Sequence, residues 1–122
     1  MKLDPDAMTW DVTCEPEDVP PLGMIEADDD GKRKAAERRA AEGLAAGNEW
    51  AWCKTRVVCR LPRVPEVATA AVFRFQSFGS LDDFLASASY AAARVAAVES
   101  MEKMAEGVLL AVALCRMKEE PS

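Results

Sequence analysis

The sequence contains no histidine among its 122 residues. Histidine is the commonest general base, a frequent zinc ligand and the side chain that titrates near neutral pH without perturbation, so its absence removes the usual route to each role. The formal net charge of −6 argues against a general nucleic-acid-binding protein, which is usually basic. Binding of nucleic acid by a local basic surface stays open. No glycine-rich phosphate-binding loop is present either.

Long apolar runs and closely spaced cysteines are also missing. The longest strongly apolar stretch, residues 108–115, is far shorter than a membrane span, and the first residues lack the apolar core of a signal peptide. Cysteines stand at positions 14, 53, 59 and 115, without the close spacing of a zinc knuckle. A four-cysteine site assembled from distant segments is the alternative. We expect free thiols in a reducing cytoplasm, with no metal, no cofactor and no membrane association.

The residues that are present suffice for one folded domain. Half of them are apolar and 30% are charged, as in globular proteins. Residues 1–27 are predicted to be an acidic lead that contains one strand and belongs to the same fold as the core, residues 28–122. Residues 1–30 hold ten acids and one lysine, whereas residues 31–122 hold eleven acids and fourteen basic side chains. Such a lead is either a solvated segment or a phosphate mimic that competes for a basic groove.

Apolar periodicity predicts the elements of an α+β fold. Residues 8–14 alternate as a half-buried strand does, and residues 48–61 and 67–78 form two further strands joined as an antiparallel hairpin. Residues 29–46 predict a short helix whose alanine stripe lies against the sheet. Apolar residues then recur every three or four positions from residue 81 to 115, too long for one helix in so small a domain. We expect a break near residues 87–90, and a small antiparallel sheet of about three strands with the short helix and a long C-terminal helical region packed on it.

The strand predicted at residues 50–61 separates its side chains onto two faces. One face is an ordinary core face, and the other aligns two indoles with three cations. If the cation-bearing side of the next strand coincides with it, one surface collects Trp50, Trp52, Lys54, Arg56, Arg60 and Arg74. Arginine beside indole is typical both of base-stacking sites that pair phosphates and of protein-binding hot spots. The alternative is that both indoles are buried and anchor the core.

A catalytic set cannot be assembled from the sequence. Cys53 or Cys59 as a nucleophile would need an activating base or cation, and Lys54 points to the opposite face from Cys53. The neighbouring acids Asp82 and Asp83 are explained by capping of the following helix. We therefore expect no enzymatic activity.

The last helix carries more apolar surface than one stripe needs, which often marks a partner surface. This pattern predicts a homodimer whose interface contains Met101, Met104, Val108, Leu109 and Val112. The alternative is that the sheet covers all of these residues.

Three motifs follow one another along the chain: residues 17–23 with the sequence EDVPPLG, the acidic run at residues 28–30, and residues 48–53 with the sequence NEWAWC. In this order they resemble a family of small proteins from tailed phages and prophages, in which an Asp-(Val/Ile/Thr)-Pro segment precedes a short helix and a Trp-Ala-Trp strand. Residues 74–79 depart from the Leu-Gly-x-Cys-Ser-Tyr segment of that family. The resemblance implies a phage origin and the host cytoplasm, but no mechanism.

Taken together, these patterns predict a non-catalytic phage accessory protein that binds a host factor or a nucleotide-type ligand, for example to counter a host defence. The alternative is a structural or assembly protein that oligomerises through its C-terminal helix.

Overall fold

The computed structural model describes residues 2–119 of the chain, with side chains described through residue 108. The elements in chain order are η1 (Pro5–Ala7), β1 (Thr9–Pro16), α1 (Asp30–Ala45), η2 (Glu49–Ala51), β2 (Cys53–Arg60), β3 (Ala68–Gln76), α2 (Leu81–Leu85) and α3 (Ala88–Glu119), where η denotes a 3-10 helix. The predicted α+β class is confirmed, with a three-stranded antiparallel sheet and a long C-terminal helix.

The sheet has the strand order β1-β2-β3, so β2 is the central strand. Val57 of β2 lies opposite Val12 of β1 on one side and opposite Ala71 of β3 on the other. The predicted hairpin is therefore present, and the acidic lead contributes β1 to the same sheet.

The start of β2 differs from the expected strand over residues 48–61. The side chain of Asn48 accepts a hydrogen bond from the backbone N–H of Trp50 at 3.1 Å and donates to the carbonyl oxygens of Phe78 and Gly79 at 3.3 and 3.1 Å. These contacts fix a turn over η2, so extended pairing begins only at Cys53. The prediction was wrong at this end because Asn48 is held by residues about thirty positions further along.

Local capping explains why the helices begin where they do. The Asp29 carboxylate accepts from the N–H of Lys32 at 2.8 Å, and the Ser80 hydroxyl accepts from the N–H of Asp83 at 3.2 Å. The Ser87 hydroxyl donates to the carbonyl of Phe84 at 2.6 Å and accepts from the N–H of Tyr90 at 3.2 Å. Ser87 thus ends α2 and begins α3, which confirms the predicted break.

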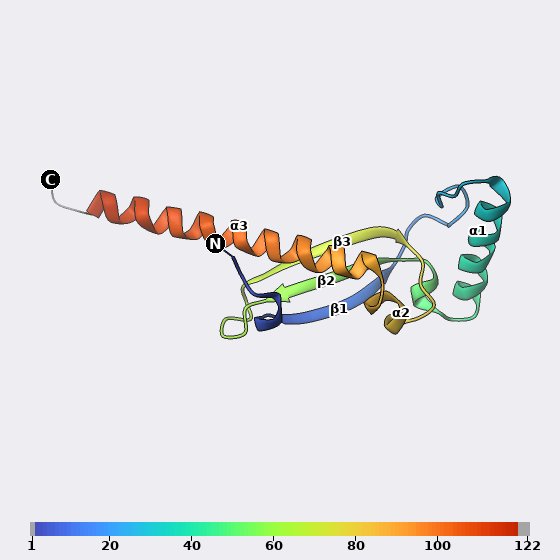
Figure 1. Ribbon diagram of the computed structural model, residues 1–122, viewed down its shortest axis with the longest axis horizontal. Coiled ribbons are helices and arrows are strands. Elements are labelled where there is room, and N and C mark those ends of the chain that lie inside the picture. The colour runs from blue at the N-terminus through green and yellow to red at the C-terminus, as the bar shows by residue number, and fades with distance from the viewer. Residues whose placement is uncertain (1, 120–122) are drawn as a thin grey trace.

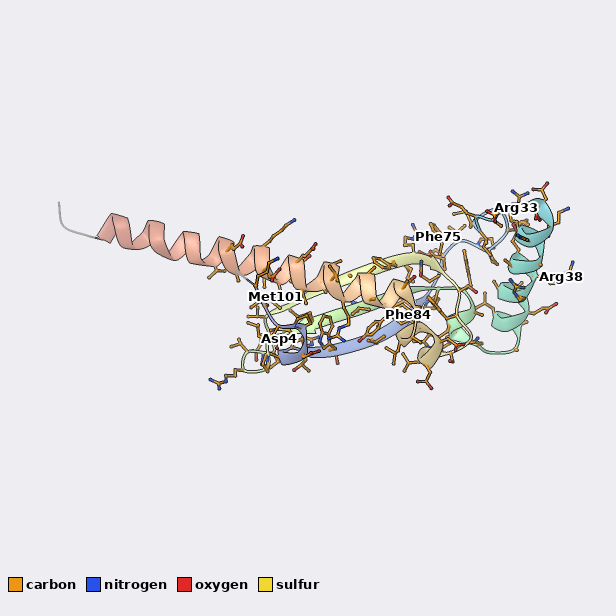
Figure 2. All side chains as sticks on the ribbon, viewed as in Figure 1. Asp4, Arg33, Arg38, Phe75, Phe84 and Met101 are labelled. Atoms are coloured by element: carbon orange, nitrogen blue, oxygen red, sulfur yellow. The ribbon has the colours of Figure 1, made fainter. Side chains whose placement is uncertain are left out.

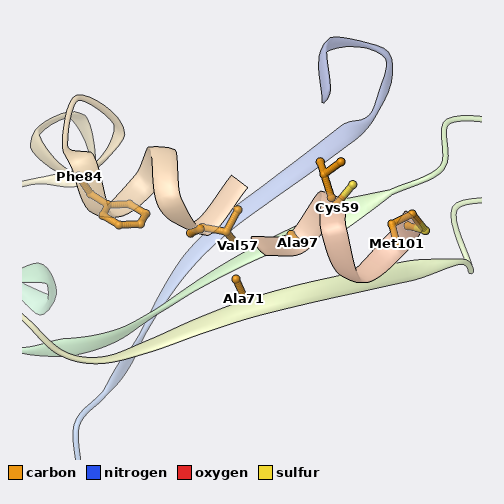
Figure 3. Packing of buried hydrophobic residues seen from close by; sticks show 8 residues of the cluster. Val57, Cys59, Ala71, Phe84, Ala97 and Met101 are labelled. Atoms are coloured by element: carbon orange, nitrogen blue, oxygen red, sulfur yellow. The ribbon is translucent and has the colours of Figure 1, made fainter. Parts of the chain in front are cut away.

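The core lies between α3 and one face of the sheet (Figure 3). Ala93 and Ala97 are buried where α3 faces the strands, and the Thr69 hydroxyl donates to the carbonyl of Ala97 at 2.7 Å. Such small side chains let the helix approach the sheet closely. Met101 is only 1% exposed and belongs to this core. It was expected on a partner surface, and this expectation was wrong because the sheet still underlies α3 at that point.

The short helix α1 stands beyond the end of the sheet, beside η2 (Figure 1). A Cβ atom on Gly43 would lie 2.5 Å from the Cβ of Ala51, so the two elements touch at a glycine. The expectation that the alanine stripe of α1 lies against the sheet was wrong, because α3 occupies the apolar sheet face and α1 packs on the turn instead.

The C-terminal part of α3 continues past the strands (Figure 1). The whole of α3, with 32 residues, spans about 48 Å, whereas the nine residues of β3 span about 30 Å. Met104 and Val108 follow Met101 at helical spacing and are 37% and 58% exposed. The side chains of Leu109 and Val112, also expected at a dimer interface, lie outside the described residues.

Candidate functional site

Both indoles of the predicted binding surface serve the fold. Trp52 is only 2% exposed, its ring stacks on Phe75 at 5.9 Å between centroids, and its Nε1–H donates to the carbonyl of Val19 at 2.6 Å. The half-buried ring of Trp50 stacks on Phe84 at 5.4 Å. The turn over η2 interrupts the strand alternation that would have aligned these rings with the cations. The alternative in which the indoles anchor the structure is the one observed.

The cations, in contrast, do share one sheet face. Arg56 lies opposite Val72 and Val58 lies opposite Ala70, so these side chains and Arg74 are on the side away from α3. The cation-bearing sides of the two strands therefore coincide. We call this side the open face, because no helix of the described chain covers it (Figure 1).

Each of the four predicted cations is paired with a carboxylate of the acidic lead. The pairs are Arg60 with Asp11 at 2.8 Å, Arg56 with Glu15 at 3.8 Å, Lys54 with Asp18 at 3.5 Å and Arg74 with Glu17 at 2.6 Å. All four acids lie within residues 11–18, so this stretch runs along the cations. An anionic ligand at Lys54, Arg56 or Arg60 would have to displace these carboxylates.

Glu17 differs from the other three acids because its side chain is fully enclosed. One oxygen accepts from Nη2 of Arg74, and the other accepts from the backbone N–H of Phe75 at 3.1 Å. The hydrogen bond from Arg74 holds the pKa of Glu17 below its usual value. Phe75 has a φ of 59°, in the left-handed region that bulky residues rarely adopt, and the pairing of β2 with β3 is irregular at this point. Glu17 therefore clamps a β-bulge in β3.

A cleft of about 800 Å³ opens between α1 and the end of β3, and Phe75 lies beside it (Figure 2). Its volume is within the usual range of small-molecule sites. One wall is formed by Ala36, Arg39 and Gly43 on a single face of α1, and the other by residues 74–79. Trp52 and Arg74 of the predicted surface line this cleft.

The three cysteines whose side chains the structure describes show no activation. Burial raises the pKa of Cys53 to about 12 and also raises the pKa values of Cys14 and Cys59, so these thiols are protonated at neutral pH. Among the residues with described side chains, no three metal-binding groups gather to hold an ion. Within the described helices, none is both long and apolar enough to cross a membrane.

Sequence reasoning did not single out Glu17 as a clamp or Arg39 as a cleft residue. Glu17 lies 58 positions before its partner Phe75, and nothing in the local sequence marks a bulge there. Arg39 is one of several cations on α1, and only the position of that helix beside β3 distinguishes it.

No family model, curated protein or solved structure matches this chain. The resemblance to phage proteins stays a prediction based on the motifs at residues 17–23, 28–30 and 48–53.

Proposed function

We propose that this chain is a non-catalytic accessory protein of a tailed phage or prophage that binds a host protein in the host cytoplasm, which would serve to counter a host defence. The observation that carries the proposal is the open face of the sheet. Small three-stranded sheets usually bury one face and leave the other to water or to a partner. Here the uncovered side carries the apolar side chains of Val58 and Val72 between charged side chains that are held in ion pairs.

The composition of the open face favours a protein over a nucleotide-type ligand. Val72 is 46% exposed, and the half-buried Val58 lies between the cations Arg56 and Arg60. Protein interfaces combine such an apolar centre with a rim of charges of both signs. A phosphate would instead meet carboxylates such as Asp11 and Glu15 beside every cation of β2, which opposes its binding.

The test compares two single substitutions on the full chain. Val72→Asp places a charge in the apolar centre of the open face, whereas Leu22→Asp changes an exposed residue in the loop between β1 and α1. Tagged chains are used to capture partners from infected cells, and the captured host protein is then purified and titrated by calorimetry. We expect Val72→Asp to weaken binding about tenfold or more and Leu22→Asp to leave it unchanged. Equal affinity for the two folded variants would refute the open face as the binding surface.

A second candidate function, assembly through α3, is favoured by one observation. Met104 and Val108 extend the core-facing stripe of the helix beyond the sheet, where they are exposed. An apolar stripe of this kind is typical of a helix that packs on another helix. Sedimentation at increasing concentration should then show a dimer that Val108→Asp dissociates. A chain that stays monomeric at all concentrations would exclude this candidate.

A further inference from the structure

We infer that the cleft between α1 and residues 74–79 binds a planar organic anion of the nucleoside monophosphate class. This site is lined mostly by residues outside the open face, and the inference does not depend on the host-protein proposal. It rests on the shape of the cleft, on two cations from opposite walls and on the bulge in β3.

The two walls differ in a way that suits a flat ring. On the α1 side the lining residues Ala36 and Gly43 are small, and Ala51 of η2 continues this surface. The opposite side carries the aromatic rings of Phe75 and Phe78. The Phe75 ring is itself stacked on Trp52 and has the Arg74 guanidinium over it at 4.6 Å, so a planar ring in the cleft would pack against the flat guanidinium and beside Phe78.

Cations stand on both walls. Arg39 lies between Ala36 and Gly43 on the same face of α1, is exposed, and makes no ion pair with any side chain that the structure describes. Arg74 stands opposite and uses Nη2 to bind Glu17. Its side chain is 48% exposed, and a guanidinium has five N–H donors, so donors remain for a second anion. Glu26 also lines the cleft, and a carboxylate there can accept from an amino group of the ring.

The β-bulge is what brings these groups together. In a regular strand Arg74 and Phe75 would point to opposite faces of the sheet. With Phe75 in the left-handed region, both residues line the cleft, and the Arg74 guanidinium lies 4.6 Å from the centre of the Phe75 ring. Backbone strain of this kind is concentrated at binding sites, where the surrounding structure must hold it in place. Glu17 holds it here with both carboxylate oxygens.

The experiment titrates the full chain with adenosine monophosphate, with adenosine and with inorganic phosphate, by calorimetry and by tryptophan fluorescence. Trp52 lines the cleft, so a bound ring changes its emission. We expect adenosine monophosphate to bind with a Kd below about 1 mM. Adenosine and phosphate alone should each bind about tenfold more weakly or worse, because each lacks one half of the recognition.

Two neighbouring arginines supply the matched variants. Arg39→Ala should weaken binding of adenosine monophosphate about tenfold. Arg38→Ala should leave it unchanged, because Arg38 lines a different hollow beside Pro21 and Leu22. Both positions are exposed on α1, so both variants should keep the native circular dichroism spectrum. Absence of binding to the wild-type chain at several times 1 mM would overturn the inference, as would equal losses in the two variants or phosphate binding as tight as that of the nucleotide.

Discussion

Replacement of Glu17 by alanine should destabilise the protein far more than replacement of any other acid in the lead. The Glu17 side chain is fully enclosed, and it binds both the guanidinium of Arg74 at 2.6 Å and the N–H of Phe75 at 3.1 Å. Its removal leaves the left-handed residue Phe75 without the contact that holds its backbone. The bulge, and with it the wall of the cleft, then loses its main support.

The size of the effect follows from two limits. A hydrogen bond to a charged group contributes about 1.5–3 kcal/mol, and removal of one partner from a buried ion pair costs about 3–5 kcal/mol. Arg74 is half exposed and regains water when Glu17 is lost, so we expect the lower range, about 2 kcal/mol for Glu17→Ala. For a domain of this size that corresponds to a drop of about 8 °C in Tm.

The pH dependence gives an independent measure of the same contact. The hydrogen bond from Arg74 holds the pKa of Glu17 below its usual value of 4.5. The folded state therefore binds the Glu17 proton less tightly than the unfolded state does. The stability from this group is complete above about pH 5 and is lost as the pH falls through the lowered pKa. The advantage of the wild type over Glu17→Gln should accordingly shrink in acid.

The assay is urea denaturation followed by circular dichroism, from pH 7 down to pH 3. Glu15→Ala is the matched control, because Glu15 belongs to the same segment but is exposed and lies 3.8 Å from Arg56. Surface pairs contribute at most about 1 kcal/mol, so the control should stay within that range. If Glu17→Ala costs no more than Glu15→Ala, Glu17 does not clamp the bulge and the reasoning fails.

Three further predictions concern the core, the helices and the thiols. Thr55→Val should raise the free energy of unfolding by about 1 kcal/mol in a urea melt, because the buried Thr55 hydroxyl has no hydrogen-bond partner among the described atoms; a loss would contradict this. Gly43→Ala should lower the free energy of unfolding by about 1 kcal/mol, because its new Cβ would press on Ala51. Gly107→Ala has nothing near its Cβ and should raise the free energy of unfolding by about 0.5–1 kcal/mol. Tm values of the two variants that shift in the same direction would refute the packing argument. Cys53, with a pKa raised to about 12 by burial, should resist alkylation by iodoacetamide at pH 8 in the native chain and react in urea; rapid native labelling, read by mass spectrometry, would show that it is accessible.

The sequence predicted those parts of the fold that depend on local signals. The alternation over residues 8–14 marks β1, and Asp82 and Asp83, which were predicted to cap a helix, lie in the first turn of α2. The break at Ser87 is set locally, because its hydroxyl donates to the carbonyl of Phe84 and accepts from the N–H of Tyr90, whereas α3 itself extends past the sheet. In each case the residues that determine the feature lie within a few positions of one another in the sequence.

The errors arise where distant segments meet. Asn48 reaches Phe78 and Gly79, which converts the expected start of a strand into a turn and moves both indoles off the cation-bearing side. The alternation rule placed the cations of β2 and β3 on one face correctly, because neighbouring strands share their pleat. Their acidic partners could not be predicted, since the pairing of β1 with β2 decides which carboxylate faces which cation.

The central claim is that recognition of a host protein takes place on the open face of the sheet. Carbodiimide labelling of exposed carboxylates tests it most directly, with the captured partner present and absent and with mass spectrometry as the readout. Asp11 and Glu15 are about half exposed in the free chain, and Asp28, at the far end beside α1, is almost fully exposed. We predict that the partner protects Asp11 and Glu15 and leaves Asp28 reactive. Unchanged labelling of Asp11 and Glu15 in a saturated complex would contradict the claim.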